Sequence, residues 1–330
     1  VIDASRAVGV VSKLINNETR ENYVKEVQSE FKQIRELRAN KNAKQRLSIE
    51  EARKRKINID WKNYIIPIPK LESNKVFDNY PLDELIDYID WSPFFHAWEL
   101  KGIFPKILDD KKYGNEAKKI FNDGKELLDQ IVSEKWLTAK AVISIRPAYA
   151  ENESVFVDDI EFNFPRQTVE KGSNKNNYCL ADFIAPKNDF LGMFAVTTGH
   201  GLEKFVKKFE NEKDDYNSIM LKILADRLAE AFAERMHERV RQEFWDYENY
   251  KKLNNDELIK EDYQGIRPAP GYPACPDHKE KDKIWSLLEV EESTGIILTE
   301  TRAMYPAASV CGWYFSNPNA KYFSVAANYK

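Results

Sequence analysis

Apolar positions follow two different periods along the chain, and each change of period marks an expected helix or strand. Spacings of three and four residues over 116–135 and 214–247 predict two amphipathic helices. Runs rich in Val, Ile and Phe over 141–150 and 153–164 predict paired strands, and 189–199 predicts a third. These helices and strands alternate irregularly, which favours an α+β fold with a mainly antiparallel sheet surrounded by helices.

The first 60 residues are strongly charged and mostly helical in pattern. Val24, Val27 and Phe31 recur at helical spacing and mark one apolar face. We therefore expect 1–60 to be a peripheral helical or linker segment and 61–330 to form a single large domain. The chain begins with valine rather than methionine. This suggests a piece of a longer polypeptide, although removal of an initiator methionine would give the same start.

Two shorter segments carry candidate ligand groups. Residues 81–100 predict a short helix that stops at Pro93 and leaves Asp90 at its C-terminal end. Near the end of the chain, VCGWYFS and KYFSVA predict two short strands joined by a turn at 317–320. On adjacent strands, alternate aromatic side chains would be free for a ligand or a partner.

Two polar residues of the long helix are harder to interpret. Glu230 lies between Ala229 and Ala231, roughly opposite the apolar stripe. It is either a solvent-facing glutamate or, if both faces of the helix are covered, a carboxylate that needs a cationic partner. His237 lies two turns further along, and we expect it on the helix surface.

Composition narrows the classes of function. Of 330 residues, 42% are hydrophobic and 32% charged, and the net charge is -4. We therefore expect neither a nucleic acid nor a membrane as partner, because the chain is acidic overall and contains no run of about 18 apolar residues. Three cysteines are too few for a disulfide scaffold, and cytoplasmic localisation is the simplest interpretation.

Motifs for common catalytic sites are absent from the sequence. It contains no GxGxxG, no P-loop and no nucleophile elbow. Binding of dinucleotides or nucleoside triphosphates and hydrolysis by a catalytic triad therefore lack support, and we assign no catalytic residue.

The stretch RPAPGYPACPDHKEK, residues 267–281, has four prolines and one glycine within its first ten residues. A rigid spacer, half of a metal site, or one wall of a small-molecule pocket would each fit. Structural zinc sites usually show two close pairs of ligands. Here only Cys275 and His278 form such a pair, while Cys179 and Cys311 lie far away in sequence. We therefore expect no metal.

Five segments together resemble one known family. They are RPAPGYPACPDHKEK, YIDWSPFF, NYCLADFIAP, LADRLAEAFAERMHERVR and ASVCGWYFSNPNAKYF. In this order they are similar to the C-terminal activation domain of cobalamin-dependent methionine synthase, and the similarity runs through nearly the whole chain. The resemblance implies a domain that binds S-adenosylmethionine. The domain would present the methyl group to a neighbouring cobalamin-binding domain for reductive methylation of cob(II)alamin, with one electron from a flavodoxin-like protein.

The resemblance also implies which residues contact the ligand. Arg267 is expected to hold the carboxylate of S-adenosylmethionine bidentately, and Asp90 its ammonium. Tyr322 would place an aromatic face near the sulfonium or the sugar, with Phe323 beside it. The proline-fixed backbone from Ala269 to Ala274 would meet the adenine edges.

Three further positions are carried over from the family. Glu230 and Glu261 match acidic residues that look functionally relevant there, and Tyr272 is the candidate for reaching toward cobalamin. Two departures stand out. Phe323 replaces a tyrosine and so offers no hydroxyl, and the sequence ends at Lys330, where some members continue with a further helical segment.

Two other functions remain open at this point. The chain could be an interaction module that keeps the fold but has lost ligand binding. It could also be a free S-adenosylmethionine-dependent methyltransferase, although it lacks the glycine-rich strand–loop–helix of the Rossmann-like enzymes. The presence of Asp90, Arg267 and Tyr322 favours the ligand-presenting domain.

Overall fold

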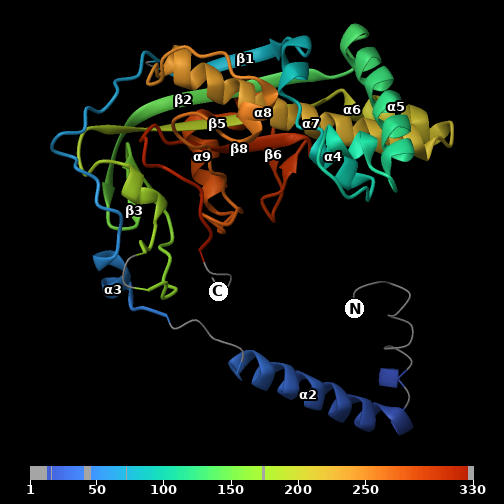
Figure 1. The fold of residues 1–330 in the computed structure, drawn as a ribbon, viewed down its shortest axis with the longest axis horizontal. Helices are drawn as coiled ribbons and strands as arrows, with labels where there is room; N and C mark the ends of the chain where they lie inside the picture. The colour runs from blue at the N-terminus through green and yellow to red at the C-terminus, as the bar shows by residue number, and fades with distance from the viewer. Residues whose placement is uncertain (1–12, 16, 41–45, 72, 173–174, 326–330) are drawn as a thin grey trace.

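The structure, a computed structural model, describes residues 13–15, 17–40, 46–71, 73–172 and 175–325, and an antiparallel six-stranded sheet lies at its centre (Figure 1). Five strands follow one another across the sheet, and β1 pairs with the first half of β2, over residues 139–143. In spatial order they are β4 (Ile160–Asn163), β3 (Ser154–Val157), β2 (Thr138–Glu151), β5 (Asp189–His200) and β8 (Ser309–Tyr314), with β1 (Lys75–Tyr80) beside β2. The prediction of a mainly antiparallel α+β fold is confirmed.

Both faces of this sheet are buried. Ile143 of β2 and Phe194 of β5 point into one apolar core, and their neighbours Val142 and Met193 point into a second core on the other face. Successive side chains of a strand point to opposite faces, so a strand buried on both sides must be apolar at nearly every position. This explains why β2 and β5 read as continuous apolar runs rather than as alternating ones.

Helices cover the two faces. The first core lies under α5 (Gly114–Ser133) and α7 (Asp215–Arg239), and the second under α9 (Glu280–Leu288) and α10 (Val290–Thr294). Figure 1 shows α4, α5 and α6 gathered at one end of the sheet and β3 at the other. The remaining elements are α2 (Asn17–Asn40), α3 (Ile49–Lys54), η1 (Asp83–Tyr88), α4 (Ser92–Ala97), η2 (Lys106–Asp109), η3 (Leu180–Phe183), α6 (Leu202–Asn211), η4 (Val240–Phe244), α8 (Asn255–Ile259), β6 (Ile297–Leu298) and β7 (Met304–Tyr305).

Two expected elements differ in detail. The strand expected over 153–164 is two strands, because the chain turns at Asp158, where φ is +49°. The helix expected over 81–100 is a 3-10 turn, η1, followed by α4, and Pro93 stands in the first turn of α4 rather than ending a helix. Proline suits the start of a helix, because its missing N–H would have no partner there.

The second strand of the expected C-terminal pair does not form. Residues 321–325 of KYFSVA have no strand conformation, and the rest of that stretch lies outside the described residues. The segment instead runs along the proline-rich loop. The Val325 N–H donates to the Pro273 carbonyl at 2.9 Å, and the Tyr322 hydroxyl accepts from the Arg267 N–H at 3.0 Å. This segment therefore forms its hydrogen bonds with the proline-rich loop and not with β8.

The long helix α7 ends at Arg239, eight residues before the expected end at 247, and the π-helical turn η4 follows it. His237, expected on its surface, is fully buried. Our expectation was wrong because the imidazole stacks on the Tyr314 ring of β8, with ring centroids 5.2 Å apart, and meets the Tyr263 ring edge to face at the same distance. Helical spacing alone does not show that a strand residue and a loop residue cover this position.

Among the described residues of the N-terminal segment, 17–40 and 49–54 form the helices α2 and α3, whereas 46–48 and 57–60 are not helical. Residues 1–12 and 41–45 of the expected peripheral segment lie outside the described residues. Figure 1 shows α2 lying apart from the sheet, whereas α3 is tied to the main body by the ion pair of Arg53 with Glu153, 2.6 Å long. The boundary at residue 60 stays a prediction.

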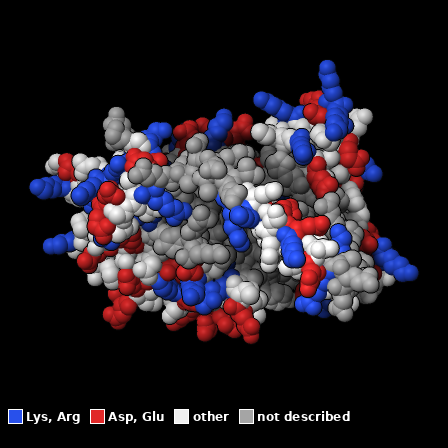
Figure 2. Space-filling view, turned by 90° about the horizontal axis from the view of Figure 1, so that it is seen from below, with Lys and Arg blue, Asp and Glu red and all other residues white. Residues whose placement is uncertain are grey.

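Acidic and basic side chains are interspersed over the face shown in Figure 2. Among the described helices, none is long and apolar enough to cross a membrane.

Candidate functional site

Two adjoining hollows, of about 320 Å³ and about 500 Å³, share the side chains of Glu230, Glu261 and Arg267. We call them together the ligand groove. Asp90 lines the smaller hollow, and the larger one is lined by Ala269, Tyr272, Tyr322 and Phe323. The structure thus brings all eight predicted ligand-binding residues to one place, although they come from segments far apart in the sequence. Their individual roles stay predictions.

Arg267 stands between the two hollows, and its guanidinium is anchored through one nitrogen. Nη1 lies 2.6 Å from Glu234 Oε2, donates to the Tyr263 hydroxyl at 2.7 Å and approaches His237 Nδ1 at 3.5 Å. The side chain is only 19% exposed. Burial lowers the pKa of Arg267, but the Glu234 carboxylate more than offsets this and holds the pKa well above its usual value.

His237 lies beneath this contact and stays neutral. Burial and the positive charges of Arg241 and Arg267 hold the pKa of the imidazole well below its usual value. Since arginine can only donate, Nδ1 accepts and the ring proton is assigned to Nε2, which lies 3.3 Å from the Tyr247 hydroxyl.

The proline-rich loop is fixed by its backbone. The Trp313 N–H donates to the Pro268 carbonyl at 2.9 Å, and the Gly271 N–H donates to the Cys275 carbonyl at 2.8 Å. Gly271 has φ +92°, and a Cβ there would come within 2.2–2.8 Å of the His278 ring. The loop therefore needs glycine at this position, and His278 packs over it.

Asp90 is positioned by the start of α4. Its Oδ1 accepts from the Ser92 N–H at 2.9 Å. The backbone therefore fixes the carboxylate in the smaller hollow, where it can face a cationic group.

Glu261 follows α8 in a conformation usually taken by glycine. Its φ is +55°, its N–H donates to the Leu258 carbonyl, and the next N–H donates to the Glu257 carbonyl, both at 3.0 Å. This is a Schellman motif with glutamate in the left-handed position. Burial raises the pKa of Glu261, an effect that Arg267 partly opposes. A strained acidic residue at the rim of a hollow is typical of a functional position.

The sequence analysis missed the residues beneath the groove. Glu234 is one turn beyond Glu230 on α7, so both glutamates share a helix face, and this spacing was the available signal. Tyr263 carried no such signal, because its contact with Arg267 depends on how the loop after α8 folds back.

The predicted absence of a metal was based on Cys275 and His278. The buried Cys275 thiol donates to the Asn163 carbonyl, at 3.9 Å, while the His278 ring lies over Gly271. Within the described ranges, no cluster of three or more His, Cys, Asp and Glu side chains could hold a metal ion. The absence of a bound metal stays a prediction.

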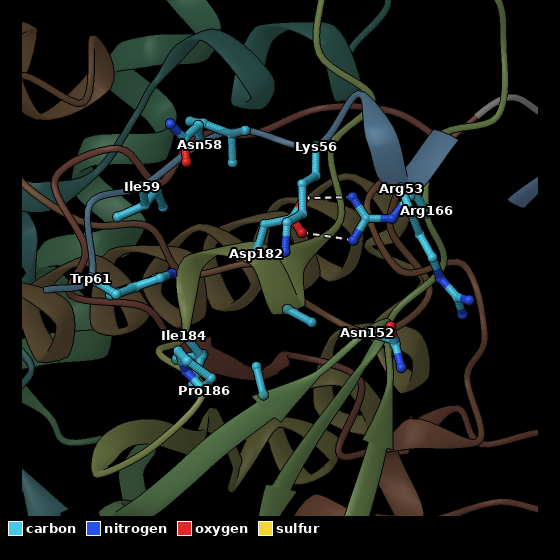
Figure 3. A pocket seen from close by; sticks show the side chains of 13 residues that line it. Arg53, Lys56, Asn58, Ile59, Trp61, Asn152, Arg166, Asp182, Ile184 and Pro186 are labelled. Atoms are coloured by element: carbon cyan, nitrogen blue, oxygen red, sulfur yellow. Dashed lines mark hydrogen bonds and ion pairs between the residues drawn. The ribbon is translucent and has the colours of Figure 1, made fainter. Parts of the chain in front are cut away.

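A further pocket, of about 290 Å³, shares no residue with the ligand groove. Figure 3 shows the Arg166 guanidinium pointing at the Asp182 carboxylate inside it. Both contacts of this pair are 2.7 Å long, and Arg166 also binds Glu153 at 2.7 Å. Glu153 also pairs with Arg53, so two arginines balance two carboxylates and the pocket wall is held by structural ion pairs.

Comparison with known proteins identifies the family. The model for the vitamin B12 dependent methionine synthase activation domain matches residues 81–329. The chain belongs to this family. A solved structure, the crystal structure of the MetH reactivation domain bound to AdoHcy, is 46% identical and aligns with a TM-score of 0.81. The match covers 85% of this chain and 90% of that one. The resemblance inferred from the sequence is confirmed, and the chain is a reactivation domain of methionine synthase.

The strain at Glu261 leads to a testable prediction. Glu261→Gly should leave the free energy of unfolding unchanged or raise it by up to about 1 kcal/mol, because glycine adopts φ +55° without a Cβ clash. The same change should weaken binding of S-adenosylhomocysteine, because a carboxylate is lost from the groove. Urea denaturation and calorimetric titration measure the two effects.

Glu289→Gly is the matched control. Glu289 also has a left-handed φ, +51°, but lines neither hollow of the groove. It should show the same stability change with unchanged affinity. Equal loss of affinity in both variants would show that Glu261 has no role in the site.

Proposed function

We propose that this domain binds S-adenosylmethionine in the ligand groove and presents its methyl group for reductive methylation of cob(II)alamin. The observation that carries the proposal is the convergence of the predicted ligand groups in a single groove, in a chain 46% identical to a domain solved with AdoHcy; these groups are Asp90, Glu230, Glu261, Arg267, Tyr272 and Tyr322. AdoHcy is the product left when S-adenosylmethionine loses its methyl group, so both ligands present the same polar groups except for the sulfonium.

Arg267 is suited to the ligand carboxylate. With Nη1 engaged by Glu234 and Tyr263, its Nε and Nη2 make no hydrogen bond to any described residue. These two nitrogens form one edge of the guanidinium, which is the geometry that binds a carboxylate bidentately. A buried charge on a fixed side chain gains more from such a pair than an exposed one would.

The acidic residues are suited to the cationic parts of the ligand. Asp90, Glu230 and Glu261 surround the groove on the side of the smaller hollow. One carboxylate can pair with the ammonium, and Asp90, with its Oδ2 free of partners among the described residues, is our assignment. The remaining negative charge favours the sulfonium of S-adenosylmethionine over uncharged thioethers.

The larger hollow is suited to adenosine. Tyr322 is 41% exposed and holds its place through the hydrogen bond from the Arg267 N–H. Its face can stack on the sugar or lie near the sulfonium. Across the hollow, the Ala269 N–H makes no hydrogen bond to any part of the chain that the structure describes, so it can meet an adenine edge.

An open groove fits a presenting domain. Tyr272 is 59% exposed at the edge of the larger hollow, where a docked partner would meet it. Cobalamin held by a neighbouring domain supplies the nucleophile, and a flavodoxin-like protein supplies one electron. The chain's own residues bind and orient the methyl donor, and we assign none of them as a base for the methyl transfer. The division into a segment 1–60 and a binding domain 61–330 belongs to this proposal.

The alternative is an interaction module that has lost ligand binding. Such a module would have a ligand groove that is filled by side chains or that lacks the ligand-binding residues. The groove is open and retains every predicted ligand group except the hydroxyl missing at Phe323, which favours the binding domain.

Binding should depend on Arg267 more than on Asp90. Arg267→Ala should weaken S-adenosylmethionine binding by about 1.5–3 kcal/mol, the range for hydrogen bonds to charged groups. Asp90→Asn should weaken it less, because the amide keeps one acceptor. Calorimetric titration checks both. Arg235→Ala, which also removes an arginine paired with a glutamate at 2.6 Å but outside the groove, is the control. An unchanged dissociation constant for Arg267→Ala would refute the assigned role.

The chain alone should bind S-adenosylmethionine without consuming it. Incubation should yield S-adenosylhomocysteine only when the cobalamin-binding domain and an electron donor are both added, which chromatography of the products would show. Methyl transfer by the chain alone to a small organic acceptor, at an enzymatic rate, would place the protein in a different class.

A further inference from the structure

We propose that Glu234 is a positioning residue that sets the Arg267 guanidinium for the amino-acid end of the ligand. This inference rests on the proposed function and adds a residue that does not itself contact the ligand. Glu234 lines the bottom of the smaller hollow on α7, and its side chain is only 8% exposed. Its Oε2 lies 2.6 Å from Arg267 Nη1.

The contacts of Arg267 are all on one side of the guanidinium. Glu234, Tyr263 and His237 meet Nη1 and make no contact with Nε or Nη2. A planar guanidinium held at one corner has its opposite edge fixed in direction. That edge is the one left for a ligand carboxylate.

Glu234 is itself held in place. The Tyr263 hydroxyl, which accepts from Arg267, lies 3.3 Å from Glu234 Oε2. The second oxygen, Oε1, is buried without a hydrogen bond among the described residues and lies 3.6 Å from Arg241 Nη1. Arg241 is fully buried, and its guanidinium lies 3.7 Å from the centre of the Tyr263 ring. A carboxylate so enclosed has one orientation available.

The charges explain why Glu234 does not repel an anionic ligand. Arg241 lies 3.6 Å from Glu234 and is also paired with Glu248 at 2.9 Å, so it offsets the charge of Glu234 only in part. Glu234 meets Arg267 at Nη1, which leaves the opposite edge of the guanidinium, Nε and Nη2, to present positive charge to the groove. Neutral His237 adds no charge between the two arginines. Holding Arg267 in its binding orientation before the ligand arrives lowers the ordering entropy lost on binding.

The positioning role predicts different changes in affinity for two related ligands. S-Adenosylhomocysteine has the carboxylate and ammonium, whereas 5′-methylthioadenosine keeps the adenosine and sulfur but lacks both. Suppose that Glu234 acts by orienting Arg267 toward the ligand carboxylate. Glu234→Gln should then weaken S-adenosylhomocysteine binding about tenfold, which is within the range of coupling energies between contacting residues. Binding of 5′-methylthioadenosine should change less than twofold.

The experiment is calorimetric titration of both ligands into the full chain and four variants. Besides Glu234→Gln, these are Arg267→Ala, the double variant and Glu238→Gln. In the Arg267→Ala background, Glu234→Gln should have no further effect on S-adenosylhomocysteine, because the group it positions is gone. Glu238 is the matched control: it is one turn further along α7, buried, and bound to Arg235 at 2.6 Å and to the Tyr88 hydroxyl, but it lies outside both hollows.

Each outcome decides the question. Equal loss of affinity for both ligands in Glu234→Gln, or full additivity with Arg267→Ala, would overturn the positioning role and indicate a structural one. If Glu234→Gln does not fold, Tyr263→Phe, which removes the hydroxyl between Glu234 and Arg267, should show the same ligand dependence at smaller size. A wild-type chain that binds neither ligand would instead refute the proposed function itself.

Discussion

The ion pair between Arg267 and Glu234 is the contact around which the groove is organised. Arg267 must stay charged although it is nearly buried, and a buried charge without a partner costs several kcal/mol. Glu234 supplies that partner at 2.6 Å from a neighbouring turn of the same helix that carries Glu230. Removing one member of such a pair typically costs about 3–5 kcal/mol. The pair thus makes a positively charged binding edge compatible with a packed interior.

The rest of the fold holds the two partners at this distance. Glu234 is carried by α7, which is fixed because its apolar face packs on β5 and β8. Arg267 stands at the start of the proline-rich loop, whose backbone is bound to β8 through Trp313. Both partners are therefore attached to the same sheet, from different segments. A sheet buried on both faces cannot shift easily, because any movement would open cavities in two cores at once.

The sequence predicted the antiparallel sheet, its main strands and the ends of α5 to within two residues, because apolar period and turn residues are local signals. It did not predict that Tyr314 of β8 and Tyr263 of a loop enclose His237, so this histidine was wrongly placed at the surface. The failed strand at 321–325 has a similar cause: its segment bonds to the loop at Pro273, a partner that no local pattern reveals.

The ligand groups of the groove were predicted from the family resemblance, whereas the residues beneath them were not. Resemblance points to side chains that touch the ligand, and Glu234 and Tyr263 act on Arg267 rather than on the ligand. Their contribution depends on distances between segments, which only the folded chain supplies. The spacing of Glu230 and Glu234 was the one local sign of a second acidic group on that face of α7.

A crystal structure of the chain with S-adenosylhomocysteine tests the account most directly. It should show the ligand carboxylate within hydrogen-bond distance of Nε and Nη2 of Arg267, with Nη1 still paired to Glu234. A ligand carboxylate bound at Nη1 with Glu234 displaced, or a ligand lying outside the groove, would contradict it.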